Sequence, residues 1–162
     1  MKHLTTTLFA AALSFAPVSL LADPVAATEK KEEKKTDQEI VVEGNDQMQF
    51  NKKTLEFKAG ETIKLTFKHV GKLPKVAMGH NFVILKKGTN LAAWAGKAMT
   101  AAATDYIPAD EESKKAVLAH TKVLGGGETD TITFSIKEAG EYQYLCSFPG
   151  HFALMQGKIT VK

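Results

Sequence analysis

The sequence has few of the features that cross-link small proteins or attach them to nucleic acid or membranes. Its single cysteine, Cys146, rules out a disulfide within the chain. The formal net charge is only +3, and no basic patch is interleaved with aromatic residues, which argues against nucleic acid as a partner. The longest apolar run, residues 8–21, is short for a membrane span of about 20 residues and is diluted by Pro17. What remains is an ordinary globular composition, 44% hydrophobic and 24% charged, in a length typical of one domain.

The N-terminus has the pattern of a secretory signal peptide over residues 1–22. Lys2 supplies the positive charge, residues 8–21 supply the apolar segment, and small residues from Ala22 to Ala27 offer cleavage sites as late as residue 27. A membrane anchor is the alternative, which the short apolar run disfavours. We therefore expect export to the periplasm, with no membrane insertion after cleavage.

Residues 23–38 are predicted to form a charged, flexible linker. Within them, residues 28–38 contain no apolar side chain and carry nearly balanced charge, so they cannot bury enough surface to offset the entropy of ordering. The folded domain is expected over residues 39–162.

This domain shows the alternation of β-strands. Ile63, Leu65 and Phe67 fall on one face of one segment, whereas the continuous apolar run 82–85 predicts a strand buried on both faces. Strands are expected at residues 39–43, 54–58, 62–68, 82–85, 116–118, 120–124, 129–136, 141–146 and 157–162. An alanine-rich segment predicts a helix over residues 90–103, and residues 104–115 are expected to be a loop. The fold class is therefore all-β, an antiparallel sandwich or barrel of about eight strands with a short helical segment.

One loop near the C-terminus carries the chemistry. Cys146 is followed five residues later by His151 and nine residues later by Met155, with a Pro-Gly turn between the first two. His80, just before a predicted buried strand, is the best candidate for a second nitrogen donor. Two imidazoles, one thiolate and a weak thioether form the ligand set of blue-copper electron-transfer sites.

Other interpretations of this loop remain open. Cys146 could be a small buried hydrophobe, although a lone thiol in an oxidising compartment is a liability unless it is buried or ligated. A catalytic zinc ion needs an open coordination position, and structural zinc sites usually use only cysteine and histidine. The methionine argues against both zinc interpretations.

The domain resembles the azurins, which are bacterial cupredoxins, over nearly all of residues 39–162. The matching stretches are residues 43–51 (EGNDQMQFN), 78–81 (MGHN), 119–122 (AHTK) and 146–155 (CSFPGHFALM). The resemblance implies a Greek-key barrel of two sheets with a helical flap near residues 90–103. It also implies one type 1 copper held by His80, Cys146 and His151, with Met155 as a distant axial ligand and the carbonyl of Gly79 opposite. Asn81 would tie the two ligand loops together.

The resemblance further implies a carrier that shuttles single electrons between periplasmic redox proteins such as cytochromes, and not an enzyme. Partners would dock on an apolar patch; the matching residues are Met48, Leu73, Met78, Met99, Phe148 and Ala153. For the methionines and Phe148 the alternative is ordinary core filling, above all for Met48 and Met99. Nothing in the sequence demands more than a monomer. Periplasmic copper buffering or delivery is the alternative function, and a copper oxidase or reductase would need histidines for a second copper.

Some positions depart from the azurin pattern or leave a role open. Azurins usually carry a disulfide where this chain has Gln38 and Gly60, so its stability must come from packing. Phe82 replaces the usual core tryptophan, and the only tryptophan is Trp94. His69 matches a histidine that azurins can couple to the redox state, and an ordinary buried histidine bonded to backbone is an equal alternative.

Overall fold

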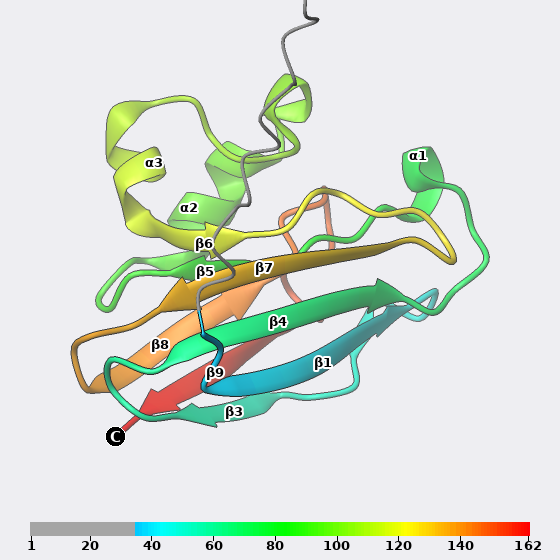
Figure 1. The fold of residues 1–162 in the computed structure, drawn as a ribbon. Helices are drawn as coiled ribbons and strands as arrows, with labels where there is room; N and C mark the ends of the chain where they lie inside the picture. The colour runs from blue at the N-terminus through cyan, green and yellow to red at the C-terminus, as the bar shows by residue number, and fades with distance from the viewer. Residues whose placement is uncertain (1–34) are drawn as a thin grey trace, which may run out of the picture. The chain divides into compact units, whose positions relative to one another are not determined.

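The strands form two sheets packed face to face (Figure 1). The computed structural model describes residues 35–162, so the predicted signal peptide and most of the predicted linker lie outside the described residues. The elements are β1 (Gln38–Asn45), β2 (Gln49–Phe50), β3 (Thr54–Phe57), β4 (Thr62–His69), α1 (Lys75–Met78), β5 (Val83–Leu85), α2 (Leu91–Ala98), the 3-10 helix η1 (Ala102–Thr104), α3 (Glu111–Ala116), β6 (Val117–His120), β7 (Thr129–Ser135), β8 (Gly140–Leu145) and β9 (Gln156–Val161). Within residues 35–162, no helix is long and apolar enough to cross a membrane.

One sheet has the strand order β2-β1-β4-β7 and the other has β3-β9-β8-β5-β6, which confirms the predicted all-β sandwich. The expectation of a purely antiparallel arrangement is wrong, because β1 pairs with β4 and β3 pairs with β9 in parallel. Between β1 and β4 the chain passes through β3 in the opposite sheet, and such a crossover returns the chain in the same direction. Alternation predicts which face is buried but not the strand direction.

Strand β5 separates two apolar clusters. Ile84 faces the space between the sheets, whereas Val83 and Leu85 face the helices, and all three are fully buried. This strand is therefore buried on both faces, as its continuous apolar run predicts. We call the cluster between the sheets the sandwich core; its buried members are Val42, Phe50, Leu55, Phe57, Ile63, Leu65, Phe67, Phe82, Ile84, Leu124, Phe134, Ile136, Tyr142, Tyr144, Cys146, Met155, Ile159 and Val161. We call the second cluster the flap core; its buried members are Val83, Leu85, Leu91, Trp94, Ala95, Ala98 and Leu145.

The helical flap comprises α2, η1 and α3 (Figure 1). The helix predicted over residues 90–103 is present as α2 and η1, and the Asn90 side chain caps α2 by accepting from the Ala93 amide. The loop predicted over residues 104–115 is wrong at its end, where α3 forms. Its signal was local: Asp110 caps it, acidic residues fill the first turn and lysines fill the last. The strand predicted over residues 120–124 is also wrong, because β6 ends at His120 and only Leu124 bridges to His80.

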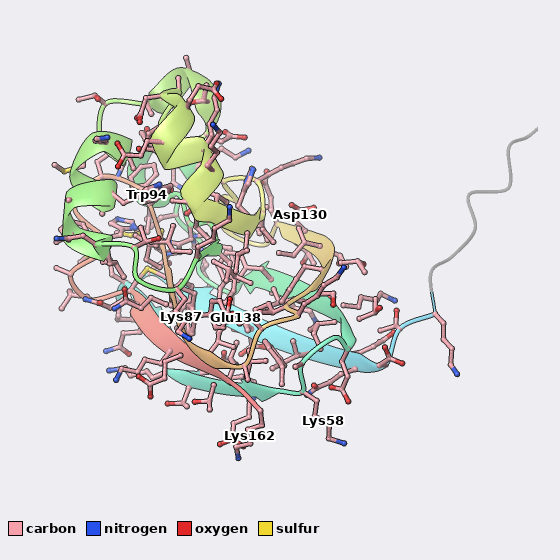
Figure 2. All side chains as sticks on the ribbon, turned by 90° about the vertical axis from the view of Figure 1, so that its left-hand side faces the viewer. Lys58, Lys87, Trp94, Asp130, Glu138 and Lys162 are labelled. Carbon is pink, nitrogen blue, oxygen red and sulfur yellow. The ribbon has the colours of Figure 1, made fainter. Side chains whose placement is uncertain are left out.

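The sheet end where azurins carry a disulfide is joined here by hydrogen bonds. Asp37 donates its backbone N–H to the Thr62 carbonyl at 2.9 Å, and its carboxylate accepts from the Thr62 amide at 2.8 Å. The Gly60 amide donates to Ile136. Lys58 and Lys162 project from this end, and the Trp94 side chain lies beside the helices of the flap (Figure 2). These bonds join the ends of the strands, and they begin two residues before the predicted domain start.

Candidate metal centre

The ligand loop folds back onto its own first residue. The Pro149-Gly150 pair forms the predicted turn, with Gly150 at φ +80° and the His151 amide donating to Phe148 at 3.0 Å. The Met155 amide then donates to the His151 carbonyl at 2.8 Å, and the Cys146 amide donates to the Met155 carbonyl at 2.9 Å. These bonds fix the spacing between the cysteine and the residues that follow it.

His80 approaches from a different part of the chain. It lies between α1 and β5, where its backbone exchanges two hydrogen bonds with Leu124, at 3.0 and 2.7 Å. Its Nε2 lies 2.9 Å from the carbonyl of Asn45, which can only accept, so Nε2 carries the proton. The Nδ1 lone pair is therefore left facing Cys146 and His151, as a metal ligand requires.

Three donor atoms converge at this point. Nδ1 of His80 lies 3.1 Å from Nδ1 of His151, and Sγ of Cys146 lies 3.8 and 3.7 Å from these two nitrogens. Metal–nitrogen bonds of about 2.0 Å and a metal–sulfur bond of about 2.3 Å in a trigonal plane would separate the donors by about 3.5 and 3.7 Å. The observed triangle fits one metal ion with little rearrangement.

Burial sets the protonation of the three groups. His80 and Cys146 are fully buried and His151 is 4% exposed. Burial lowers the pKa of His80 to about 4 and also lowers the pKa of His151, so both imidazoles are neutral at pH 7. Burial raises the pKa of the Cys146 thiol to about 12, against the opposing effect of the Asn81 and Phe148 N–H groups. A metal ion must therefore displace the thiol proton, whereas the imidazoles are ready to bind.

Met155 and Gly79 lie beside this triangle. Met155 is fully buried in the sandwich core, and its methyl carbon would lie 3.3 Å from a Cβ added at Gly44. The Gly79 carbonyl oxygen lies 3.9 Å from Sγ of Cys146. A Cβ at Gly79 would come within 2.7 Å of both Phe148 and Val123, so only glycine lets this backbone approach the sulfur.

A polar shell joins the two ligand segments. The Asn81 side chain accepts from the Ser147 amide at 2.8 Å and donates to the Ser147 hydroxyl at 2.8 Å, which is the tie that the resemblance implies. Its second donor bond, at 3.2 Å, goes to the carbonyl of Asp105 in the flap. Sequence reasoning missed Ser147, Asp105 and Tyr106 as neighbours of the site, and only the position of Ser147 next to the cysteine could have indicated one of them.

His69 stacks on His80, with ring centroids 4.4 Å apart and an interplanar angle of 20°. Its Nδ1 accepts from the Gly71 amide at 3.1 Å, and its Nε2 lies 2.8 Å from the Met78 carbonyl. It is thus a buried histidine bonded to backbone, in the neutral form with the proton on Nε2. Redox coupling of His69 stays a prediction.

The residues of the predicted docking patch differ in exposure. Leu73, Met99 and Ala153 are exposed, whereas Met48, Met78 and Phe148 are partly buried. The exposure of Met99 contradicts the core-filling alternative, which holds better for Met48 because it packs against the sandwich core. Sequence reasoning missed three further exposed apolar residues close to these positions in the chain: Val70 at 53%, Val76 of α1 at 89% and Leu154 at 57%.

Comparison with known proteins places this geometry in a family. Residues 22–162 match the family described as copper binding proteins, plastocyanin/azurin family. Azurin from Alcaligenes faecalis is 44% identical over 127 residues, covering 76% of this chain and 97% of that protein. The outer membrane protein H.8 of Neisseria meningitidis is 44% identical over 123 residues, covering 74% of this chain and 65% of that protein.

A solved structure gives the same result in three dimensions. Auracyanin A, a "blue" copper protein from Chloroflexus aurantiacus, superposes with a TM-score of 0.68 at 34% identity, over 76% of this chain and 98% of that one. The buried His80–Cys146–His151 triangle fits the copper site of such proteins. The chain therefore belongs to the plastocyanin/azurin family of copper-binding proteins and is a cupredoxin, a blue-copper electron-transfer protein.

Proposed function

We propose that one type 1 copper ion is held by Nδ1 of His80, Nδ1 of His151 and Sγ of Cys146, with Met155 and the Gly79 carbonyl as weak axial ligands. The observation that carries this assignment is the donor triangle, with sides of 3.1, 3.7 and 3.8 Å. The bound ion supplies a couple between Cu(I) and Cu(II). The chain keeps the ligands close to one geometry for both oxidation states, because backbone bonds and the sandwich core fix each donor.

Electrons would enter and leave through His151. Of the three proposed equatorial ligands it alone keeps any exposed surface, about 4%, and the Phe148 ring lies 4.8 Å from its own. Exposed apolar residues nearby suit brief contact with another redox protein, since transient electron-transfer interfaces are small. We assign docking to the predicted patch of Met48, Leu73, Met78, Met99, Phe148 and Ala153.

The proposed setting is the periplasm, where the chain would shuttle electrons between respiratory redox proteins as a monomer. Support comes from the signal-like residues 1–22 and from the lone cysteine, which ligation would protect in an oxidising compartment. The charged segment 23–38 would then link the cleavage site to the domain. Copper delivery is disfavoured because all three equatorial donors are buried, whereas delivery needs ligands that an acceptor can reach.

The test is the visible spectrum of the copper-loaded chain. We expect an intense thiolate-to-copper band that bleaches on reduction and returns on oxidation, and that Cys146→Ser abolishes. The matched control is Ser135→Ala at the end of β7, which should leave the band unchanged. A colourless copper complex, or a band that survives in Cys146→Ser, would contradict the ligand assignment. Rapid loss of copper to an apo acceptor would favour delivery over electron transfer.

A further inference from the structure

We propose that the Asp105–Tyr106 pair of the flap positions the copper ligand loop and thereby tunes its reduction potential. The inference rests on the proposed copper ligation. It concerns residues that make no direct contact with any of the ligand atoms described above, so Asp105 and Tyr106 are positioning residues.

The backbone of this pair is held in an unfavourable conformation. Asp105 has φ +52° and ψ +36°, and Tyr106 has φ +60°, so two consecutive residues with side chains occupy the left-handed region. Such conformations persist only where the surrounding structure enforces them, and they gather at functional sites. The Tyr106 amide donates to the Ala101 carbonyl at 2.9 Å, which fixes the turn after η1.

The first contact with the copper site runs through Asn81. The Asp105 carbonyl accepts from the Asn81 side-chain amide at 3.2 Å. The same side chain holds Ser147, the neighbour of Cys146, through two bonds of 2.8 Å. A shift of the Asp105 carbonyl would therefore move the Asn81 side chain and, through it, Ser147 beside the cysteine ligand.

The second contact runs through Phe148. The Tyr106 ring meets the Phe148 ring edge-on, with centroids 5.1 Å apart, and Phe148 in turn packs on the His151 ring at 4.8 Å. One strained pair thus reaches the ligand loop next to the cysteine and again next to the second histidine. Hydrogen bonds and apolar packing around a thiolate ligand set the potential of copper centres of this kind.

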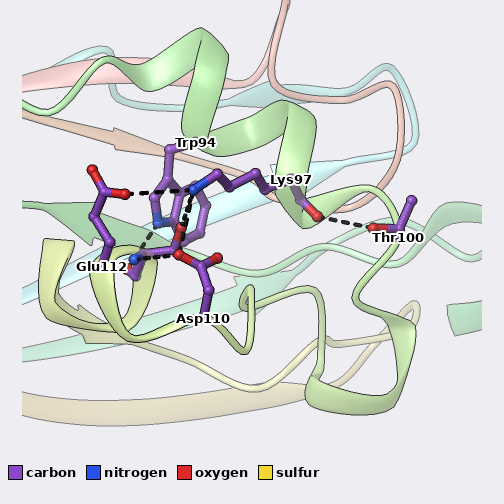
Figure 3. Close-up of polar contacts among 6 residues, drawn as sticks. Trp94, Lys97, Thr100, Asp110 and Glu112 are labelled. Atoms are coloured by element: carbon purple, nitrogen blue, oxygen red, sulfur yellow. Dashed lines mark hydrogen bonds and ion pairs between the residues drawn. The ribbon is translucent and has the colours of Figure 1, made fainter.

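The flap itself is anchored away from the copper. Lys97 of α2 pairs with Asp110 at 3.3 Å and with Glu112 at 3.8 Å, and the Trp94 indole donates to the Ser113 carbonyl at 3.0 Å (Figure 3). These contacts join α2 to α3, which begins five residues after Tyr106. The Asp105–Tyr106 pair is therefore fixed by the Ala101 bond before it and by helix α3 after it. It can hold Asn81 and Phe148 in one position.

The experiment uses two matched pairs of variants in the full copper-loaded chain. Tyr106→Leu removes the ring contact, whereas Tyr106→Phe keeps it. Asp105→Val resists a positive φ because valine is β-branched, whereas Asp105→Gly permits it. Phe57→Leu, at the opposite end of the sandwich, controls for loss of stability alone.

We expect Tyr106→Leu and Asp105→Val to lower the reduction potential and to shift the thiolate-to-copper band and the Cu(II) hyperfine splitting. We also expect several-fold faster hydrogen exchange at the Ser147 amide in the Cu(I) protein. Tyr106→Phe, Asp105→Gly and Phe57→Leu should keep the wild-type potential and spectra.

Wild-type spectra and potential in Tyr106→Leu and Asp105→Val would overturn the inference while leaving the copper assignment intact. A wild-type chain with no blue band would overturn both. If the reduction potential of Phe57→Leu shifts as much as that of Tyr106→Leu, the effect is general destabilisation. That result would also overturn the inference.

Discussion

The two apolar cores of the domain are built differently. The sandwich core is aromatic: Phe50 alone packs against the rings of Phe67, Phe82 and Tyr144, with centroids 5.5 to 5.8 Å apart. The flap core contains one aromatic residue, Trp94, among small and aliphatic side chains. It is completed by polar contacts between helices, such as the indole bond to Ser113. Ring packing dominates the sandwich core, although the Tyr142 hydroxyl donates to the Glu138 carbonyl, whereas hydrogen bonds and ion pairs join the helices around the flap core.

This difference shows which part of the fold holds the metal site rigid. Cys146 and Met155 belong to the sandwich core, so the packing that stabilises the two sheets also fixes these donors. The flap contacts the surroundings of the site through Asn81 and Phe148, and Phe152 of the ligand loop packs against the flap core. We therefore expect damage to the sandwich core to affect stability most, and damage to the flap core to be better tolerated.

The largest effect is expected from a leucine truncation made in each core. Leu65→Ala, in the fully buried middle of β4, should lower the free energy of unfolding by about 4–5 kcal/mol, because the close-packed sheets cannot collapse into the cavity. Leu91→Ala, at the start of α2, should cost about 2–3 kcal/mol. Urea unfolding of the apo proteins measures both. Equal losses would mean that the two cores are equally rigid.

A second expectation concerns the stability of the copper-free protein at acid pH. The folded-state pKa of His80 is about 4, below its unfolded value of about 6.5, so below pH 6.5 the unfolded chain binds more protons. Apo stability should therefore fall between pH 6.5 and 4, by about 3 kcal/mol from His80, with His151 acting in the same direction.

Urea unfolding of the apo chain across this pH range checks the expectation, with His80→Gln as the control that should make the profile shallower and leave the contribution of His151. Copper should protect the wild type, because a bound metal competes with the proton. The flap core contains no histidine, so Leu91→Ala should leave the slope unchanged. A flat wild-type profile would show that His80 is not held neutral by burial.

A smaller effect is expected from Trp94→Phe. The ring is largely retained, but the buried Ser113 carbonyl loses its donor, which should cost about 1–2 kcal/mol. Thermal unfolding at low and high salt measures it, and the loss should not depend on salt, because the bond is between uncharged groups. A loss above that of Leu91→Ala would indicate that packing of the indole, and not its hydrogen bond, dominates the flap core.

The smallest effect is expected from Lys97→Met. The lysine and its partner Asp110 are both about half exposed, so the pair should contribute less than about 1 kcal/mol. The difference from wild type should shrink further as salt rises, because screening weakens exposed pairs. Lys87→Met, which breaks the exposed pair with Glu138 visible in Figure 2, is the matched control outside the flap. A salt-independent loss larger than that of Trp94→Phe would contradict this order.

Much of the fold could be predicted because strand alternation is a local signal. Ile63, Leu65 and Phe67 are buried as expected, and the apolar run at β5 lies between two cores. The parallel pairing of β1 with β4 could not be predicted, since direction depends on how the chain crosses between sheets. Helix α3 was missed because it buries little apolar surface, although the sequence contains its N-cap residue, Asp110.

The sequence by itself determined which loop we propose to hold the copper ion. Cys146, His151 and Met155 are local in the chain, and the Pro-Gly turn between the first two fixes their approach through short-range geometry. Their chemical types, a thiolate, an imidazole and a thioether, already select a soft metal.

Only the tertiary structure decided the rest of the site. It brought His80 to within 3.1 Å of a histidine 71 residues away, and it fixed the His80 tautomer through the carbonyl of Asn45. It buried the three donors, which keeps the imidazoles neutral, and it laid the Asp105–Tyr106 turn against Asn81 and Phe148. The physical reason is that burial, tautomer choice and loop-to-loop contact depend on the simultaneous packing of distant segments, which no local spacing encodes.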